Sequence, residues 1–246
     1  ERMLVTLATG RGLMLVGEPG TAKSLLSELL ATAICGDAGL TIQGGAAITE
    51  DQIKYAWNYA LLINQGPSTQ ALVPAPLYQG MRDGKIVRFE EITRTPLEVQ
   101  DCLLGMLSDR VMAIPELTGD DSQLYARAGF NIIATANTRD RGVNEMSAAL
   151  KRRFDFETVF PIMDFQQELE LVANASARLL EHSGIPHKVP DVVLELLIQT
   201  FRDLRADGGK KTAMDTLSAV MSTAEAVNVA HAVGVRAWFL AGRAGE

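Results

Sequence analysis

Hydrophobic positions divide the chain into two parts of different character. In the first two thirds, short apolar runs rich in β-branched residues alternate with stretches at helical spacing. Residues 24–34 and 96–108 predict helices, and the apolar runs predict strands at residues 13–16, 40–43, 86–89, 111–114 and 130–136. Such alternation is typical of an α/β fold, in which helices cover both faces of a parallel sheet.

The two predicted helices carry more detailed expectations. The helix at residues 96–108 begins with Thr95, Pro96 and Glu98, which is the spacing of a capping box with proline at the first helical position. The helix at residues 24–34 gathers its apolar side chains on one face, made of Leu25, Leu26, Leu29, Leu30, Ala33 and Ile34.

After residue 160 the pattern predicts helices and no strands. Asp164 with Gln167 marks the start of a first helix, which ends near Gly184. Asp191 starts a second helix that stops at residues 208–209, and a third covers residues 214–232. We therefore predict a separate small, all-helical domain at residues 164–246.

Composition narrows the classes of protein that this chain can be. Of its 246 residues, 47% are hydrophobic and 22% are charged, which is ordinary for a globular protein. The formal net charge of −7 argues against a protein that binds nucleic acid without regard to its sequence.

No membrane span is expected, because the most apolar late segment, residues 224–242, contains charged residues such as Glu225 and Arg236. Cys35 and Cys102 lie far apart in apolar stretches, which suits small buried side chains in a reducing compartment. With no signal peptide, the sequence predicts a cytoplasmic protein. The absence of an initiator methionine leads us to expect a part of a longer protein.

Residues 17–24, GEPGTAKS, lie between a predicted strand and a predicted helix. This is the setting of a phosphate-binding P-loop, in which backbone N–H groups turn toward the phosphates and the helix N-terminus adds its positive dipole end. Lys23 is expected to reach the β- and γ-phosphates, and the Ser24 hydroxyl to bind Mg²⁺. ATP and Mg²⁺ are the expected cofactors, and the predicted nucleotide-binding residues are Gly17, Glu18, Pro19, Gly20, Thr21, Ala22, Lys23 and Ser24.

One residue departs from the P-loop pattern G-x-x-x-x-G-K-[ST]. Ala22 stands where the pattern has its second glycine. Because this position opens the helix, we expect right-handed backbone angles there, which alanine adopts without strain. An incidental turn before a helix is the alternative interpretation of the segment.

Two adjacent carboxylates follow the predicted strand at residues 86–89. Hydrolysis at a P-loop needs a carboxylate on the Mg²⁺ side and a group that orients the attacking water. We assign Glu90 to the metal side and Glu91 to the water, with an acidic surface turn as the alternative. Arg88 is unusual in a central strand, so its side chain should pair with an acid or emerge at a face of the sheet.

With these motifs in this order, the chain resembles the AAA+ ATPases, and within them the MoxR-like branch, which is related to the Rubisco-activase-like and nitric-oxide-reductase-activating ATPases. The resemblance covers most of the chain. Residues 90–110 are similar to the segment after the acidic pair, 130–138 to the strand that ends in the sensor-1 asparagine, and 148–155 to the helix that bears the arginine finger. The resemblance implies an AAA+ core at residues 1–160, sandwiched by helices, and a helical lid domain at 164–246.

The resemblance also implies roles for single residues. By position, Asn137 would help to place the lytic water beside Glu91. Arg153 would be the arginine finger, and Arg152 could share or replace it. A guanidinium stabilises the charge that develops on the γ-phosphoryl oxygens, and in this family a neighbouring subunit supplies it, which implies a ring, with a hexamer expected. An exposed basic helix end is the alternative interpretation of both arginines.

Two long connections and the lid complete the resemblance. Residues 57–80 would hold the helix-2 insert of this branch, and residues 111–130 resemble the hairpin before sensor 1; such projections face a pore or a partner. The lid lacks the sensor-2 arginine, because Ala224 stands in its place, and Lys210 and Lys211 are the nearby substitutes.

The implied function is that of an ATP hydrolase that remodels or activates a protein client, together with a partner that carries a von Willebrand A domain. Two other functions stay open. A nucleic-acid-dependent motor or restriction subunit shares the fold and the acidic pair. A slow nucleotide switch is compatible with Ala22 and Glu90, which stand where the family has glycine and aspartate.

Overall fold

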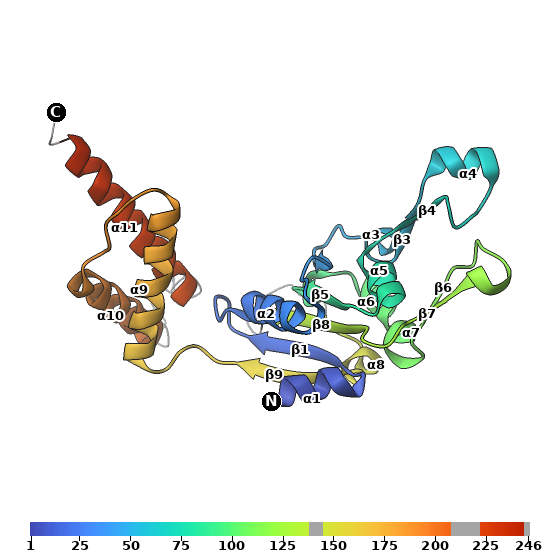
Figure 1. The fold of residues 1–246 in the computed structure, drawn as a ribbon. Helices are drawn as coiled ribbons and strands as arrows, with labels where there is room; N and C mark the ends of the chain where they lie inside the picture. Colours follow the sequence, from blue (N-terminus) through green and yellow to red (C-terminus); the bar gives the residue numbers. More distant parts are fainter. Residues whose placement is uncertain (138–144, 208–221, 244–246) are drawn as a thin grey trace. The chain divides into compact units, whose positions relative to one another are not determined.

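The computed structural model describes residues 1–137, 145–207 and 222–243. The chain forms two compact units (Figure 1). The α/β unit consists of Glu1–Gly17 and Lys23–Val159, and the helical unit of Phe160–Glu246 with the loop residues Glu18–Ala22.

A five-stranded parallel sheet forms the centre of the α/β unit. The strand order is β2-β5-β8-β1-β9, with the bounds Thr41–Gln43, Ile86–Glu90, Asn131–Asn137, Gly12–Gly17 and Phe154–Val159. The predicted fold, a parallel sheet between helices followed by a helical domain, is confirmed. The edge strand β9 was missed in the sequence because polar residues, among them Asp155 and Glu157, interrupt its apolar run.

The carboxyl ends of the parallel strands meet at one edge of the sheet. Gly17 at the end of β1 pairs with Asn137 at the end of β8. Gln43 at the end of β2 pairs with Glu90 at the end of β5. Residues that are far apart in the sequence therefore come together where ligands bind in open α/β sheets.

Alternate strand residues fill two separate cores on the two faces of the sheet. On one face, residues such as Met14 and Phe89 pack with α3 (Glu50–Ile53), α5 (Pro76–Asp83), α7 (Leu103–Ser108) and α8 (Ala148–Lys151). On the other face, residues such as Leu13 and Ile133 pack with α1 (Arg2–Thr9) and α2 (Lys23–Cys35). The helices thus cover the two faces of the sheet, and loops follow the strands at its carboxyl edge.

Helix α2 does not bury its apolar stripe as the sequence predicts. Its buried positions are Lys23, Ser27 and Ala31. Leu26 and Leu30 are partly buried, whereas Leu25 is 55% and Leu29 is 57% exposed. The physical reason lies in the first turn, where Lys23 and the residue after it must point toward the site. This fixes the rotation of the helix about its axis and turns a polar and small face to the sheet.

The segment predicted as one helix at residues 96–108 forms two helices. After the short 3-10 turn η1 (Ile92–Arg94), α6 (Leu97–Asp101) is followed by α7, and the two meet at Cys102. The predicted capping box is wrong: Pro96 is itself the N-cap residue, and it has no side-chain oxygen that could accept a backbone N–H. Burial raises the pKa of the Cys102 thiol to about 12, so this partly buried cysteine is a neutral thiol.

Both long connections form antiparallel hairpins that extend from the same end of the α/β unit (Figure 1). One joins β3 (Tyr55–Trp57) to β4 (Leu72–Pro74) and carries α4 (Tyr59–Gln65) at its tip. The other joins β6 (Val111–Ala113) to β7 (Gln123–Tyr125) through the 3-10 turn η2 (Gly119–Ser122). Their contact runs through the Glu116 carboxylate, which accepts hydrogen bonds from the Tyr55 hydroxyl at 3.0 Å and the Trp57 indole N–H at 3.4 Å.

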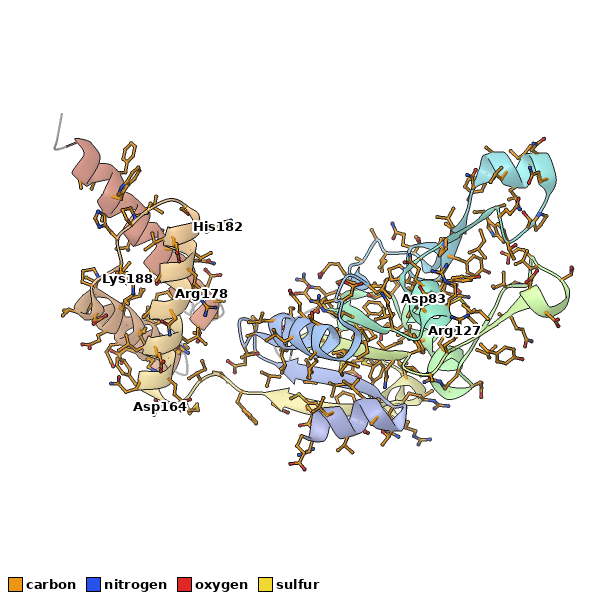
Figure 2. All side chains as sticks on the ribbon, in the orientation of Figure 1. Asp83, Arg127, Asp164, Arg178, His182 and Lys188 are labelled. Carbon is orange, nitrogen blue, oxygen red and sulfur yellow. The ribbon has the colours of Figure 1, made fainter. Side chains whose placement is uncertain are left out.

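The helical unit contains α9 (Phe165–His182), α10 (Asp191–Asp207) and α11 (Thr223–Arg243). Asp164, labelled at the start of α9 in Figure 2, accepts a hydrogen bond from the backbone N–H of Gln167 at 2.8 Å, as its predicted capping position requires. The third helix runs beyond the predicted end at residue 232 to Arg243, because alanine and apolar residues continue the helical pattern. Its predicted start, residues 214–221, lies outside the described residues.

The helical unit is also joined by a buried carboxylate. Glu168 of α9 is 0% exposed and accepts hydrogen bonds from Arg202 and Arg205 of α10 and from the Thr223 hydroxyl of α11, at 2.9, 2.7 and 2.8 Å. One side chain therefore connects all three helices around the apolar core. No helix within the described ranges is long and apolar enough to cross a membrane.

Candidate nucleotide and metal site

The loop at residues 17–24 leaves β1 at its carboxyl end and enters α2, as a P-loop must. Within the loop, Gly20 has a φ of 77°, and the Thr21 hydroxyl donates to the carbonyl oxygen of Glu18 at 2.9 Å. Lys23 is 7% exposed, and its Nζ donates to the carbonyl oxygen of Gly17 at 3.1 Å. The ammonium group is thus held at the mouth of the loop.

Ala22 does not have the right-handed backbone predicted from its place at the start of the helix. Its φ is 60°, in the left-handed region that glycine occupies at low cost. A residue with a Cβ atom loses about 1–2 kcal/mol in this conformation. The second glycine of the P-loop pattern is therefore replaced at a position whose geometry favours glycine.

Glu90 ends β5 and is 4% exposed. Its Oε2 accepts hydrogen bonds from the hydroxyl groups of Ser24 at 2.7 Å and Thr135 at 2.8 Å. Its Oε1 lies 2.6 Å from the Ser27 hydroxyl and 3.0 Å from a guanidinium nitrogen of Arg88. Of the two outcomes expected for Arg88, the structure has the one in which it pairs with an acid.

Burial disfavours the charged form of Glu90, but the hydrogen bonds from three hydroxyl groups and the positive charge of Arg88 outweigh it and lower the pKa of this carboxyl. Glu90 is therefore ionised at neutral pH. Its contact with the Ser24 hydroxyl provides oxygen ligands of the kind that Mg²⁺ prefers. Within the described residues no cluster of three His, Cys, Asp or Glu could hold a metal, so a fit to Mg²⁺ requires phosphate and water oxygens as further ligands.

Glu91 lies one residue beyond β5 and also has a left-handed backbone, with a φ of 53°. Its backbone N–H donates to the Thr135 hydroxyl oxygen at 2.9 Å. Its partly exposed carboxylate accepts hydrogen bonds from Arg94 at 2.9 Å and from the Gln43 side chain at 3.4 Å. The two acids therefore point to different surroundings, Glu90 to the buried hydroxyl groups and Glu91 to the open edge of the sheet.

Asn137 ends β8 beside Gly17, the first residue of the P-loop. Ala224 lies in the first turn of α11 and offers no cation. Lys210 and Lys211, the substitutes considered for the missing lid arginine, lie outside the described residues.

Arg153 lies at the opposite end of the sheet from the P-loop. Its carbonyl oxygen accepts from the backbone N–H of Gly12, at the start of β1. Its guanidinium donates to the Ser108 hydroxyl at 2.8 Å and to the carbonyl oxygen of Ala149 at 3.0 Å. Arg152 beside it is exposed. The structure therefore separates both arginines from the P-loop of their own chain.

Four residues of this site were missed in the sequence: Ser27, Gln43, Arg94 and Thr135. Two of them had a signal. Ser27 follows Lys23 by one helical turn, and Thr135 is a hydroxyl residue inside an otherwise apolar strand. Gln43 and Arg94 had none, because only the pairing of β2 with β5 brings Gln43 to the acids, and only the η1 turn brings Arg94 back to Glu91.

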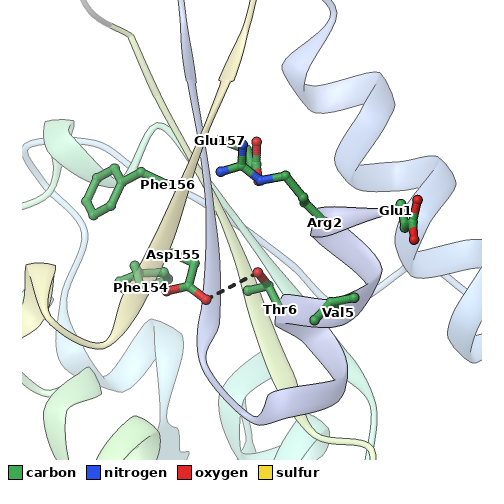
Figure 3. Close-up of a pocket in the computed structure, with 8 residues that line it drawn as sticks. All are labelled: Glu1, Arg2, Val5, Thr6, Phe154, Asp155, Phe156 and Glu157. Atoms are coloured by element: carbon green, nitrogen blue, oxygen red, sulfur yellow. Dashed lines mark hydrogen bonds and ion pairs between the residues drawn. The ribbon is translucent and has the colours of Figure 1, made fainter.

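A hollow of about 610 Å³ lies elsewhere, between α1 and residues 154–157 of β9 (Figure 3). Thr6 of α1 donates to Asp155 at 3.2 Å, and Arg2 pairs with Glu157 at 2.8 Å across it. Its lining contains none of the predicted site residues. The size of a hollow therefore does not identify the candidate site, which rests on the chemistry at the carboxyl edge.

The AAA domain of the dynein-related subfamily matches residues 12–154, more than half of the chain and the whole of this edge. The chain belongs to the AAA+ ATPase family. The C-terminal domain of YehL-like AAA+ ATPases matches residues 166–245, so the AAA+ unit is followed by the helical domain of that group.

Among related proteins, YehL of Escherichia coli (strain K12) is 91% identical over 246 residues, which are 100% of this chain and 68% of that protein. YojN of Bacillus subtilis (strain 168) is 27% identical over 152 residues, which are 61% of this chain and 48% of that protein. The AAA+ ATPase described here thus spans about two thirds of the first relative and about half of the second.

Solved structures share the fold. NtrX from Brucella abortus in complex with ADP has a TM-score of 0.60 at 15% identity, over 95% of this chain and 47% of that one. The complex between subunits BchI and BchD of magnesium chelatase has a TM-score of 0.51 at 17% identity, over 70% of this chain and 60% of that one. At these identities the likeness shows the AAA+ fold.

Proposed function

We propose that this AAA+ ATPase binds ATP with Mg²⁺ at residues 17–24 and hydrolyses it. The observation that carries the proposal is the contact between the Ser24 hydroxyl and Glu90 at 2.7 Å, at the point where the P-loop helix meets the carboxyl end of β5. A P-loop with a hydroxyl and an ionised carboxylate in this relation is suited to a nucleotide–Mg²⁺ complex.

Each residue at this edge then has a role. The loop residues Gly17 to Ala22 turn backbone N–H groups to the phosphates, Lys23 holds the β- and γ-phosphates, and Ser24 with Glu90 holds the cation. Glu91 orients the attacking water, with Asn137 on the neighbouring strand as the second group that positions it. Mg²⁺ supplies charge neutralisation on the phosphate oxygens when it is bound.

We further propose that Arg153, supported or replaced by Arg152, acts on the nucleotide of a neighbouring subunit in a ring, with a hexamer as the expected form. The location of both arginines at the far end of the sheet supports this, since neither lies near its own P-loop. The guanidinium of the neighbouring subunit would stabilise the charge that develops on the γ-phosphoryl oxygens.

The work done by hydrolysis is proposed to be the remodelling or activation of a protein client in the cytoplasm, as in the MoxR-like branch, with a von Willebrand A domain protein as the partner. The two projecting hairpins give such a partner a surface to contact. The net charge of −7 disfavours a nucleic-acid partner.

The deciding experiment compares ATP turnover and ATP binding of the full-length protein with those of Glu91→Gln. We expect the variant to lose at least about a hundredfold in turnover, because the water loses its orienting carboxylate, while its ATP affinity is kept. Glu98→Gln is the matched control, since Glu98 is an exposed residue of the next helix. Equally slow turnover in all three proteins would instead indicate a nucleotide switch, and a rate that rises severalfold with added DNA would indicate a nucleic-acid motor.

A further inference from the structure

Arg88 is a charged residue in the second strand of the sheet, where it is 8% exposed. Its Nε donates to the Ser27 hydroxyl oxygen at 3.0 Å, and one terminal nitrogen donates to Glu90 Oε1 at 3.0 Å and to the carbonyl oxygen of Ser24 at 3.2 Å. A buried guanidinium is costly unless its donors are used. Here two nitrogens bond to Ser24 and Ser27 of the P-loop helix and to the acid opposite it. The other terminal nitrogen donates to the carbonyl oxygen of Ala38 and to the Thr41 hydroxyl oxygen, both at 3.4 Å.

The two oxygens of Glu90 have separate sets of partners. Oε1 is held by Ser27 and Arg88, whereas Oε2 faces the hydroxyl groups of Ser24 and Thr135. The oxygen that touches the expected Mg²⁺ ligand Ser24 is therefore not the one that carries the ion pair. Because the Ser24 hydroxyl donates its hydrogen bond to Oε2, the lone pairs of the serine oxygen are available to a cation.

Glutamate needs such support more than aspartate does. It has one more methylene group and one more rotatable bond, so its carboxylate is less restricted than that of the shorter acid. The two partners of Oε1 restrict the carboxylate. Ser27 lies on the P-loop helix and Arg88 on β5, so both partners belong to fixed elements of the fold.

We propose that Ser27 and Arg88 form a clamp on Oε1 of Glu90, which positions this glutamate to serve where the family has aspartate and thereby sets the affinity of the nucleotide site for Mg²⁺. Both residues act through Glu90, so both are positioning residues. The inference rests on the proposed function, because it concerns the Mg²⁺ that accompanies ATP.

The first test is a Mg²⁺ titration of the full-length protein in the presence of a non-hydrolysable ATP analogue, with binding of the analogue followed by calorimetry. Ser27→Ala is expected to raise the Mg²⁺ concentration at half-saturation about 10–100-fold, as is usual when a partner of a metal-binding group is removed. Binding of the analogue in EDTA should stay as in the wild type, because the phosphate-binding loop is unchanged.

Ser176→Ala is the matched control. Ser176 is also a buried helical serine, 1% exposed, and its hydroxyl oxygen likewise lies near the carbonyl oxygen three residues earlier, at 3.2 Å against 2.8 Å for Ser27. This control should leave the Mg²⁺ half-saturation within about twofold of the wild type, because Ser176 belongs to α9 and not to the P-loop helix or β5.

A second pair of variants separates positioning from structural support. Arg88→Met removes the guanidinium but keeps an apolar stem, and we expect the same rise in Mg²⁺ requirement, with partial recovery in Arg88→Lys. Arg82→Met is its control, because Arg82 pairs with Asp83 at the surface. Glu90→Asp is expected to bind Mg²⁺ more weakly than the wild type, since the shorter acid cannot reach both the clamp and Ser24.

The outcomes are distinguishable. The clamp is overturned if Ser27→Ala and Arg88→Met lower the thermal midpoint but leave the Mg²⁺ half-saturation unchanged, or if Glu90→Asp binds Mg²⁺ as well as the wild type does. A wild-type protein that binds the analogue equally with and without Mg²⁺, or not at all, would overturn the proposed function and the clamp together.

Discussion

Ala22 and Glu91 both have left-handed backbones, with φ of 60° and 53°, and both lie at the candidate site. Such conformations cost energy in residues with a Cβ atom and persist only where neighbouring groups hold them. For Glu91 the holding groups are visible: its N–H donates to Thr135, and the Glu90 carbonyl oxygen beside it accepts from the N–H of Gly44 at 2.7 Å. The strained backbone of Glu91 is therefore held by the same residues that form the candidate site.

Gly44 gives a test at this scale. A Cβ atom there would clash with the carbonyl oxygens of Glu91 and Glu90, so Gly44→Ala must displace the backbone of the acidic pair. We expect the free energy of unfolding to fall by about 1–3 kcal/mol and ATP turnover to fall at least about tenfold. Chemical denaturation and a steady-state ATPase assay measure the two effects.

The adjacent Gly45→Ala is the control, because a Cβ atom there would lie within 4 Å of no described residue other than its chain neighbours. It should change the free energy of unfolding by less than about 0.5 kcal/mol and leave turnover unchanged. Equal effects of the two substitutions would contradict the close approach between Gly44 and the acids.

At the scale of elements, single polar side chains fix the positions of neighbouring helices, because hydrogen bonds are directional and apolar contacts are not. Glu168 does this for the three helices of the helical unit. Burial opposes the ionisation of its carboxyl, but the hydrogen bonds from Arg205, Arg202 and Thr223 outweigh burial and lower its pKa. A carboxyl with a lowered pKa in the folded state stabilises that state while it is ionised.

Glu168→Gln should therefore destabilise the helical unit by about 2–4 kcal/mol at pH 7, because two partly buried guanidinium groups lose their charged, buried acceptor. The difference from the wild type should be complete above the pKa of an unfolded glutamate, about 4.3, and should shrink as the pH falls through the lower pKa of the folded state. Urea unfolding between pH 7 and pH 3, followed by the fluorescence of Trp238 in a Trp57→Phe background, reports on this unit.

Glu170→Gln provides the comparison for the same change of charge on the same helix, since Glu170 is exposed. It should alter the free energy of unfolding by less than about 0.5 kcal/mol at every pH. A pH-independent difference between the wild type and Glu168→Gln would argue against an ionised, hydrogen-bonded carboxylate in the folded state.

At the scale of the whole molecule, the proposed function places Arg153 of one chain at the nucleotide of another. Arg153 adjoins Gly12, whereas the P-loop begins at Gly17, and the strand between them spans about 16 Å at 3.3 Å per residue. This separation supports the proposal that Arg153 acts on the nucleotide of a neighbouring copy of the chain.

Arg153→Ala should then lose ATP turnover while its ATP affinity is kept, and Lys23→Ala should lose both. Mixing the two inactive proteins should restore part of the turnover, because some mixed interfaces join an intact P-loop to an intact Arg153. The measurement is the ATPase rate of mixtures across the full range of ratios. Lys151→Ala, which changes an exposed neighbour, should retain the wild-type rate. No recovery in a mixture that demonstrably co-assembles would contradict action between subunits.

Much of the fold could be predicted because strands and helices have different periods of apolar residues, and the central strands of this sheet are nearly all apolar. The strand β9 and the apolar face of α2 could not. An edge strand is half exposed and alternates with polar residues, so its run is broken in the sequence. The face that α2 presents to the sheet depends on where Lys23 and Ser27 must point, which overrides the pattern of its leucines.

The amino-acid sequence by itself determined the order of the motifs: a P-loop after a strand, two acids after a later strand, an asparagine after another. Local composition suffices for this, because turn residues and apolar runs act on near neighbours. Only the tertiary structure decided which side chains form hydrogen bonds to the same carboxylate oxygen. The parallel pairing of β2, β5 and β8 brings Gln43, Glu90 and Thr135 to one edge, and helix α2 adds Ser24 and Ser27 to it. The left-handed angle of Ala22 was likewise decided there, since backbone angles answer to the contacts of the folded chain as well as to the residue.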